Sequence, residues 1–272
     1  MLKGKKIGFI GGGAIAEALT RGILNAGLLT ADQVTVGDVA AERLAYLSKT
    51  YGVATSLDTA AVAAQADVLF LTVKPQVIGA VLDTVAPAVT KKTLVISVAA
   101  GVTLAMLQEK LPKGPVIRVM PNTPAAVGAG MSAIALGKQA TAKDGEVAMA
   151  VFAAVGRAVT VNEDMLDAVT GLSGSGPSFA FVLIDALADA GVRVGFPRQL
   201  AITLAAQTLL GAAKMVLETG EHPAKLRDMV TSPAGTSIAG VHVLEQKGVR
   251  AALMDAVVAA TERSREMGQK FR

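Results

Sequence analysis

A glycine-rich turn near the N-terminus constrains the fold of this chain more than any other feature. Lys6 to Ile10 is a short apolar run, three glycines follow, and apolar residues then recur at helical spacing from Ala14 to Ala26. In a G-x-G-x-x-A pattern the first glycine permits a tight turn, the second lets phosphates approach the backbone, and the alanine lets helix and strand pack closely. An ordinary glycine turn is the alternative, but the flanking strand and helix favour a dinucleotide site. Its phosphate-binding residues would be Gly11, Gly13, Ala14 and Ile15, because N–H groups at a helix start attract anions.

Strand-like and helix-like segments alternate through the first part of the chain. Strands are predicted at Lys6 to Ile10, Gln33 to Val36, Val68 to Val73, Leu94 to Val98, Val116 to Met120 and Ser132 to Leu136. Helices are predicted at 14–26, Glu42 to Thr50, Gln76 to Ala86 and Thr103 to Lys110. This alternation predicts an α/β fold with a parallel sheet, which together with the glycine turn means an N-terminal Rossmann dinucleotide-binding domain.

The pattern changes near Asn162, after which helical segments dominate. Pro177 to Gly191, Pro197 to Thr219 and Val249 to Arg265 are rich in Ala and Leu. Ser178 to Leu187 carries only Asp185 as a charge, so this helix should be buried, either in its own domain or in an interface. We therefore expect a dinucleotide-binding domain at 1–162 and an all-α domain at 163–272.

Composition narrows the function. Apolar residues make up 52% and charged residues 18%, a low charged share that suggests an oligomer with a buried apolar interface. The 26 basic and 22 acidic residues are scattered and aromatics are only 3%, which argues against nucleic-acid binding. The chain contains no run of about 18 uncharged apolar residues, so the sequence predicts no membrane-spanning helix. The chain has no Cys and its start does not resemble a signal peptide, so we expect a cytoplasmic protein.

Asp38, directly after the second predicted strand, bears on the choice between NADH and NADPH. A carboxylate there can accept hydrogen bonds from both ribose hydroxyls, whereas a 2′-phosphate would be repelled and would favour an Arg. No basic residue follows Asp38 until Arg43. The alternative is that Asp38 only caps the next helix.

The ends of the later strands add further cofactor candidates. Val73, Lys74 and Pro75 follow one strand, and Ala99 and Asn122 follow the next two. Ligands bind at the carboxyl edge of such sheets, so all five should line the crevice. The prolines on either side of Asn122 and Thr123 would stiffen that wall beside the nicotinamide. A solvated Lys74 and a merely stiff connection remain the alternatives.

Two segments of the helical half are rich in glycine and small hydroxyl residues. One spans 171–177, and the other, 230–237, opens a helix that runs to about Glu245. Such loops expose N–H groups and can bind anions at a helix start, although two ordinary N-caps would look similar.

Several segments resemble the pyrroline-5-carboxylate reductase family, in order and over nearly the whole chain. They are Met120-Pro121-Asn122-Thr123-Pro124, 167–177 (DAVTGLSGSGP), 211–215 (GAAKM), His222-Pro223, Ser232-Pro233 and 242–245 (HVLE). The resemblance implies a Rossmann domain followed by a helical dimerisation domain, with an active site shared between two subunits. It also implies that NADPH or NADH reduces the C=N bond of 1-pyrroline-5-carboxylate to give L-proline.

The resemblance further implies roles for the loop from Val230 to Ser237. Ser232 and the backbone near Gly235 and Thr236 would bind the substrate carboxylate, and Ser237 would hydrogen-bond the ring nitrogen as the catalytic residue. Departures are Ala234, where members often have a second glycine, and Asp38-Val39, where Asn-Arg is common. Ala14 also replaces a frequent Asn. The Asp38-Val39 pair weakens an inherited preference for NADPH.

Reduction of an imine needs orientation and charge balance, because a protonated imine is already electrophilic. No metal site is predicted, since His222 and His242 lack ligand-like spacing. Two other functions stay open. A reductase of β-hydroxy acids would want a Lys beside the substrate, for which Lys214 is the candidate, and a non-catalytic dinucleotide-binding protein would have no reason for the Ser-rich second site.

Overall fold

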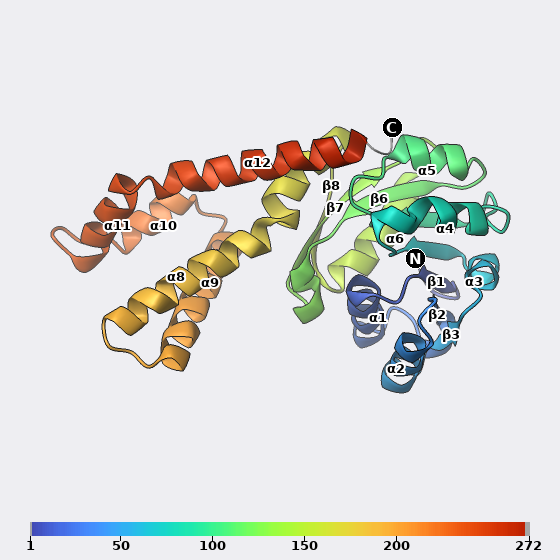
Figure 1. Ribbon diagram of the computed structural model, residues 1–272, viewed down its shortest axis with the longest axis horizontal. Helices are drawn as coiled ribbons and strands as arrows, with labels where there is room; N and C mark the ends of the chain where they lie inside the picture. Colours follow the sequence, from blue (N-terminus) through green and yellow to red (C-terminus); the bar gives the residue numbers. More distant parts are fainter. Residues whose placement is uncertain (1, 270–272) are drawn as a thin grey trace. The chain divides into compact units, whose positions relative to one another are not determined.

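The computed structural model describes residues 2–269 and contains two compact units. The first unit extends to Ser175 and includes the chain again from Ala259, whereas Gly176–Val258 forms the second. Figure 1 shows strands confined to the first unit and long helices in the second. The expected Rossmann domain followed by a helical domain is therefore confirmed.

An eight-stranded sheet forms the centre of the first unit, in the order β3-β2-β1-β4-β5-β6-β7-β8. All pairs from β3 to β6 are parallel, β7 is antiparallel to β6, and β8 is parallel to β7. The strand bounds are β1 Ile7–Ile10, β2 Val34–Gly37, β3 Ala54–Ser56, β4 Val68–Leu71, β5 Leu94–Ser97, β6 Val116–Met120, β7 Gly130–Leu136 and β8 Gly156–Thr160. The predicted parallel sheet thus holds for the cofactor-binding part, while β7 reverses direction.

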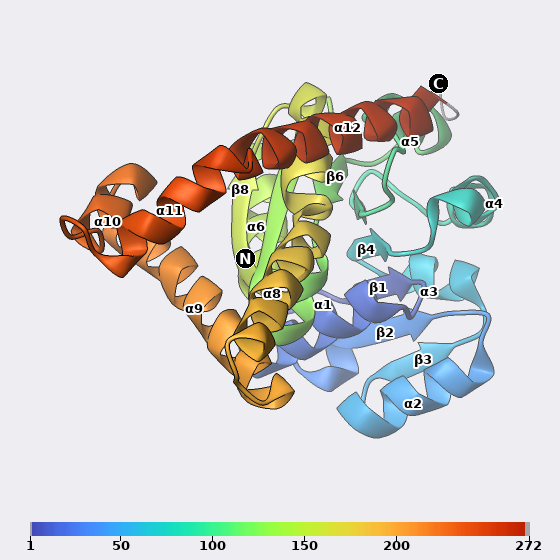
Figure 2. The same ribbon diagram turned by 60° about the vertical axis from the view of Figure 1, so that its left-hand side comes forward.

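Helices cover both faces of the sheet. One face buries Leu19, Leu47 and Phe152 of α1 Ala14–Asn25, α2 Ala41–Tyr51 and α6 Ala142–Ala153. The other buries Val62, Leu82 and Leu107 of α3 Thr59–Gln65, α4 Ile78–Val85 and α5 Leu104–Lys110. Figure 2 shows β1, β2 and β3 side by side at one end of this sheet. Since β1 and β4 are buried at every position, their sequences are continuously apolar.

Short 3₁₀ and π segments connect these elements. They are η1 Ala31–Gln33, η2 Pro75–Val77, η3 Thr123–Val127 and η4 Glu163–Met165, followed by α7 Leu166–Val169 and the π-turn η5 Thr170–Gly174. The predicted boundary at 162 precedes η4, while the compact units separate 13 residues later, after Ser175. The last part of α12 Val249–Gln269 returns to the first unit, where Ser264 Oγ donates to Asp167 Oδ1 at 2.7 Å.

The second unit consists of helices with little core of their own. They are α8 Gly176–Arg193, α9 Arg198–Thr219, α10 Pro223–Met229, α11 Thr236–Gln246 and the first part of α12. Among described residues the buried cluster here holds only Ala188, Ala201 and Ala205, whereas Phe181 is 63% exposed. By length and composition alone, the helical segments Glu163–Arg193 and Arg198–Thr219 could cross a membrane. Only 11% of the residues in the most apolar stretch of each segment are buried. A dimer interface would account for the same uncovered apolar surface.

Candidate functional site

The carboxyl ends of four parallel strands come together at one edge of the sheet. Ile10 pairs with Gly37 on one side and with Leu71 on the other, and Leu71 pairs with Ser97. The next residues along the chain therefore emerge next to one another. This edge is where ligands bind in open α/β sheets.

The glycine loop has the shape that a phosphate group needs. Gly11 has a φ of +100°, and a Cβ there would lie 2.9 Å from Val73 Cγ1, so both conformation and space require glycine. Gly13, the N-cap of α1, is exposed, and a Cβ there would meet nothing within 4 Å. No protein contact explains Gly13, but an anion approaching the first turn of α1, at Ala14 and Ile15, would.

Asp38 contacts the glycine loop directly. Its Oδ2 accepts the Gly12 N–H at 2.6 Å and its Oδ1 accepts the Ala40 N–H at 2.9 Å. The carboxylate therefore fixes the loop as well as the turn before α2. Because an ionised carboxylate has about four acceptor positions, roughly two remain for ribose hydroxyls.

A cavity of about 280 Å³ lies beside Asp38 and Gly11. Its other lining residues are Ile10, Gly37, Val39, Thr59, Val73, Val77, Ala80, Val81 and Thr84. Val39 is 88% exposed although apolar, which suits a flat ring lying against it. Sequence reasoning identified Asp38 and Val73 here but missed the valines of α4 and η2, because they belong to a different part of the chain.

Thr72 is a second residue that sequence reasoning missed. Its hydroxyl donates towards the carbonyl oxygens of Ile10, at 3.0 Å, and Gly11, at 2.6 Å, and so ties β4 to the glycine loop. Lys74 follows as an exposed N-cap of η2, with Pro75 as the first residue of that turn. Both lie at the carboxyl edge, as predicted.

Ala99 and Asn122 lie after β5 and β6 at the same edge. Ala99 is buried, and its N–H donates to Ser97 Oγ at 3.3 Å. The Asn122 amide is occupied at both ends, since Oδ1 accepts the Met131 N–H at 2.8 Å and Nδ2 donates to the Ser173 carbonyl at 3.1 Å. Asn122 therefore joins β7 to the π-turn, and its part in cofactor binding would use the backbone.

In the second unit, Ser232 to Gly235 form a tight turn before α11. The Gly235 N–H donates to the Ser232 carbonyl at 3.0 Å, with proline second in the turn and Ala234 third at φ 59°. This is the conformation of a type II turn, whose third position favours glycine. The residue that departs from the family pattern thus carries a left-handed backbone.

The turn places the predicted substrate residues at the start of a helix. Gly235 is the N-cap of α11 and offers no capping side chain, so the N–H groups that follow are open to an anion. Ser232, Thr236 and Ser237 are all exposed, as is Val230. A mostly apolar hollow of about 490 Å³ adjoins them, lined by Ala234, Gly235, Ile238, Ala239, Val241, His242 and Glu245.

Other candidates are explained by local structure. Lys214 is exposed and pairs with Glu218 at 3.6 Å on the same helix, as an ordinary ion-paired helix lysine does. His222 Nδ1 accepts the Ala224 N–H at 3.2 Å as the N-cap of α10. Among the described residues, no three His, Cys, Asp or Glu side chains cluster as metal ligands would.

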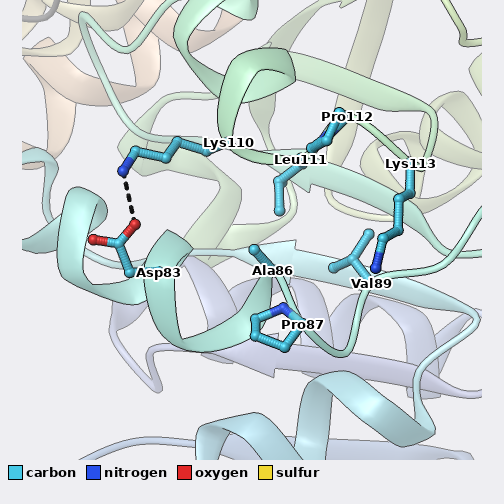
Figure 3. A pocket seen from close by; sticks show the side chains of 8 residues that line it. All are labelled: Asp83, Ala86, Pro87, Val89, Lys110, Leu111, Pro112 and Lys113. Carbon is cyan, nitrogen blue, oxygen red and sulfur yellow. Dashed lines mark hydrogen bonds and ion pairs between the residues drawn. The ribbon is translucent and has the colours of Figure 1, made fainter.

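A further hollow of about 350 Å³ lies between the carboxyl ends of α4 and α5 (Figure 3). Lys110 Nζ lies 2.7 Å from Asp83 Oδ1 at its rim, and this ion pair raises the pKa of Lys110. Crossover helices run antiparallel to the strands, so these helix ends lie at the amino edge of the sheet. The hollow is thus on the opposite edge from the glycine loop.

Comparison with known families follows the same division of the chain. Residues 163–267 match the family described as pyrroline-5-carboxylate reductase dimerisation, and residues 6–101 match the family described as NADP oxidoreductase coenzyme F420-dependent. The pyrroline-5-carboxylate reductase of Methanosarcina acetivorans is 50% identical over 270 residues, which cover 99% of this chain and 100% of the relative. The Arabidopsis thaliana enzyme is 47% identical, covering 97% and 96%.

Solved structures agree. The pyrroline-5-carboxylate reductase of Coxiella burnetii superposes with a TM-score of 0.92 at 35% identity, covering 97% of this chain and 98% of that one. The Plasmodium falciparum pyrroline carboxylate reductase, solved with NADP bound, gives 0.87 at 30% identity, covering 98% and 99%. From its sequence, its fold and these relatives, the chain belongs to the pyrroline-5-carboxylate reductase family.

Proposed function

We propose how this chain reduces the C=N bond of 1-pyrroline-5-carboxylate to L-proline with NAD(P)H. The glycine loop and the strand ends beside it hold the cofactor, and the loop from Val230 to Ser237 holds the substrate. The observation that supports this division most strongly is the Ser232–Gly235 turn, which leaves hydroxyl groups and the first N–H groups of α11 exposed together.

The substrate carboxylate would bind at the amino end of α11. The Ser232 hydroxyl and the backbone N–H groups that follow Gly235, beginning with Thr236, are donors, because the Gly235 N–H already closes the turn on the Ser232 carbonyl. The helix dipole favours a negative charge there. Ser237 lies in the first turn of that helix, so its hydroxyl can hydrogen-bond the ring nitrogen while the carboxylate is held. A serine without an adjacent base is a poor acid at neutral pH, so positioning the nitrogen is its principal role.

A bound dihydronicotinamide supplies the hydride in this chemistry. The residues of this chain would bind and orient its phosphates at Gly11, Gly13, Ala14 and Ile15, with Asp38 at the adenosine ribose. The apolar cavity bounded by Val39 and Val73 would take the adenine ring. Lys74, Pro75, Ala99 and Asn122 would continue the binding surface along the carboxyl edge.

We expect NADH to be at least competitive with NADPH. At an effective dielectric of about 20, two like charges about 4 Å apart repel by about 4 kcal/mol before solvent screening, so a 2′-phosphate beside Asp38 is disfavoured. With NADH, the free acceptor positions of Asp38 would bind hydroxyls instead. The Plasmodium falciparum relative was solved with NADP bound, so the comparison of the two cofactors has to be made on this chain itself.

The decisive assay follows NADH and NADPH absorbance with 1-pyrroline-5-carboxylate as substrate. Replacing Asp38 by Ser together with Val39 by Arg should shift kcat/KM towards NADPH, since the repulsion is removed and a cation is added. Ser237→Ala should lower kcat more than it raises KM, because the nitrogen changes charge during the reaction. A wild-type preference for NADPH of about a hundredfold, some 2.7 kcal/mol, would contradict the assignment of Asp38.

The dimerisation family spans the second unit, so the chain self-associates. We infer a homodimer or a multiple of dimers in which the exposed apolar residues of α8 and α9 are covered. Both helices leave most of their large apolar side chains open within one chain, among them Phe181, Val182 and Leu210.

A further inference from the structure

Glu17 lies on α1 just behind the glycine loop and collects three donors. Its Oε1 accepts the hydroxyl of Tyr51 at 2.8 Å and that of Tyr46 at 3.0 Å, while its Oε2 pairs with Arg43 Nη2. Its side chain is 19% exposed. Burial alone would raise the pKa of Glu17, but the hydrogen bonds from Arg43, Tyr51 and Tyr46 outweigh it and lower that pKa. The carboxylate is therefore ionised at neutral pH and is held by three donors.

Arg43 is held in place by the same group of residues. Its Nε donates to the Gly12 carbonyl at 2.5 Å, and its guanidinium lies 5.0 Å from the centre of the Tyr46 ring. The N–H of Gly12 meanwhile donates to Asp38 Oδ2 at 2.6 Å. The Arg43 guanidinium and the Asp38 carboxylate therefore bind the same residue, Gly12, one at its carbonyl and the other at its N–H. Asp38 is the residue proposed to bind the ribose hydroxyls.

This proximity gives Arg43 two alternative uses. An Arg near the end of the second strand is the residue that suits a 2′-phosphate, because its planar donors match phosphate oxygens. Here Glu17 and the Gly12 carbonyl use two of its donor groups. To reach a 2′-phosphate, Arg43 would have to leave a partly buried carboxylate without its cation.

We propose that Glu17 is a specificity-determining residue for the cofactor: it holds Arg43 on the glycine loop and so withholds it from a 2′-phosphate. This rests on the proposed binding of the adenosine ribose beside Asp38. Glu17 does not touch the cofactor itself. It acts through Arg43, and a purely structural Glu17 would support both cofactors equally.

The test measures binding of two fragments that lack nicotinamide, adenosine 5′-monophosphate and adenosine 2′,5′-bisphosphate, by calorimetry on the full chain. Glu17→Gln keeps the size and the tyrosine hydrogen bonds but removes the charge that holds Arg43. Binding of the bisphosphate should strengthen relative to binding of the monophosphate, so that the ratio of the two Kd values changes by about fivefold. This is the upper range for the contribution of a partly exposed ion pair. The ratio of kcat/KM for NADPH over NADH should move in the same direction.

Two control variants show whether the effect passes through Arg43. Tyr51→Phe removes another hydrogen bond to Glu17 without touching Arg43, so the Kd ratio should stay at the wild-type value. In an Arg43→Met background, Glu17→Gln should no longer change the ratio. Equal weakening of both fragments by Glu17→Gln, or an unchanged ratio, would overturn the proposal.

If Glu17→Gln fails to fold, Arg43→Met alone still tests the proposal. A wild-type Arg43 that is withheld contributes little to bisphosphate binding, so the ratio should not change. Selective loss of bisphosphate binding would show that Arg43 already reaches the 2′-phosphate, and the proposal would be wrong. Failure of the site assignment itself looks different: replacing Asp38 by Ser with Val39 by Arg would then leave the ratio unchanged as well.

Discussion

Gly235→Ala offers a sharp test of substrate binding by Ser232. A Cβ at position 235 would lie 2.3 Å from Ser232 Oγ, well inside van der Waals contact. The φ of Gly235 is −76°, which any residue adopts, so the substitution probes this contact and not backbone freedom. The added methyl must displace the hydroxyl without removing it.

The expected loss follows from the hydrogen bond that the displaced hydroxyl no longer makes. A hydrogen bond to a charged group contributes about 1.5–3 kcal/mol. With a tenfold change for each 1.36 kcal/mol, kcat/KM for 1-pyrroline-5-carboxylate should fall roughly tenfold to a hundredfold or slightly more, mostly through KM. Ser232→Ala should cost about the same, because it deletes the same interaction.

The double variant decides between this explanation and a general disturbance of the loop. With Ser232 already replaced by Ala, the methyl at 235 has no hydroxyl to displace and lies closest to the carbonyl oxygen of residue 232, at 3.1 Å, so Gly235→Ala should add less loss than it causes alone. Ala234→Gly is the matched control: it relaxes the left-handed backbone at φ 59°, leaves the hydroxyl in place and should preserve kcat/KM. Losses that simply add in the double variant would refute the reasoning.

Three further predictions concern assembly and stability. Light scattering should show a dimer or a multiple of dimers with an interface above about 2,000 Å² per pair, and a stable, active monomer would contradict the inferred interface. Glu163→Ala should lower the free energy of unfolding by about 2–4 kcal/mol in urea titration, because it strips Arg118, 9% exposed, of a carboxylate at 3.0 Å and leaves the Leu104 N–H without its acceptor. The pKa of Glu17 is lowered from 4.5, so the stability it contributes is present above that value and lost as pH falls through the folded pKa. The stability difference between wild type and Glu17→Gln should therefore shrink in acid, and a constant difference down to about pH 2 would count against the hydrogen bonds to Glu17.

Local pattern was enough to predict the parts of the fold that depend on burial. β1, β4 and β5 are covered on both faces and therefore appear in the sequence as continuous apolar runs. β3 and β8 were missed because they are short or exposed: β3 has three residues, none buried, and β8 carries Arg157. Helices α3, α6 and α10 were also missed, although Thr141 forms a capping box with Asp144 that marks the start of α6.

The positions of candidate site residues were predictable where the residues directly follow a strand. Gly11 and Asp38 were placed correctly at the sheet edge because they follow strands directly. The hydrogen bond between Asp38 and Gly12, and the one between Asn122 and Ser173, join residues that are 26 and 51 positions apart in sequence. Such partners depend on the tertiary structure, so no local pattern shows them. The assignments of Ser232 and Ser237 to the substrate stay predictions.

The return of α12 to the first unit affects how this chain can fold as it is made. Asp167 accepts its hydrogen bond from Ser264 of α12. Gly101, at φ +78°, also packs closely against α12, because a Cβ there would lie only 3.5 Å from the Gly268 nitrogen. These partners are separated by 97 residues or more, so their contacts can form only after the helices between them and α12 have been synthesised. A chain that has just completed the sheet therefore holds an unfinished unit, and synthesis of α12, not of the last strand, supplies the contacts that complete it.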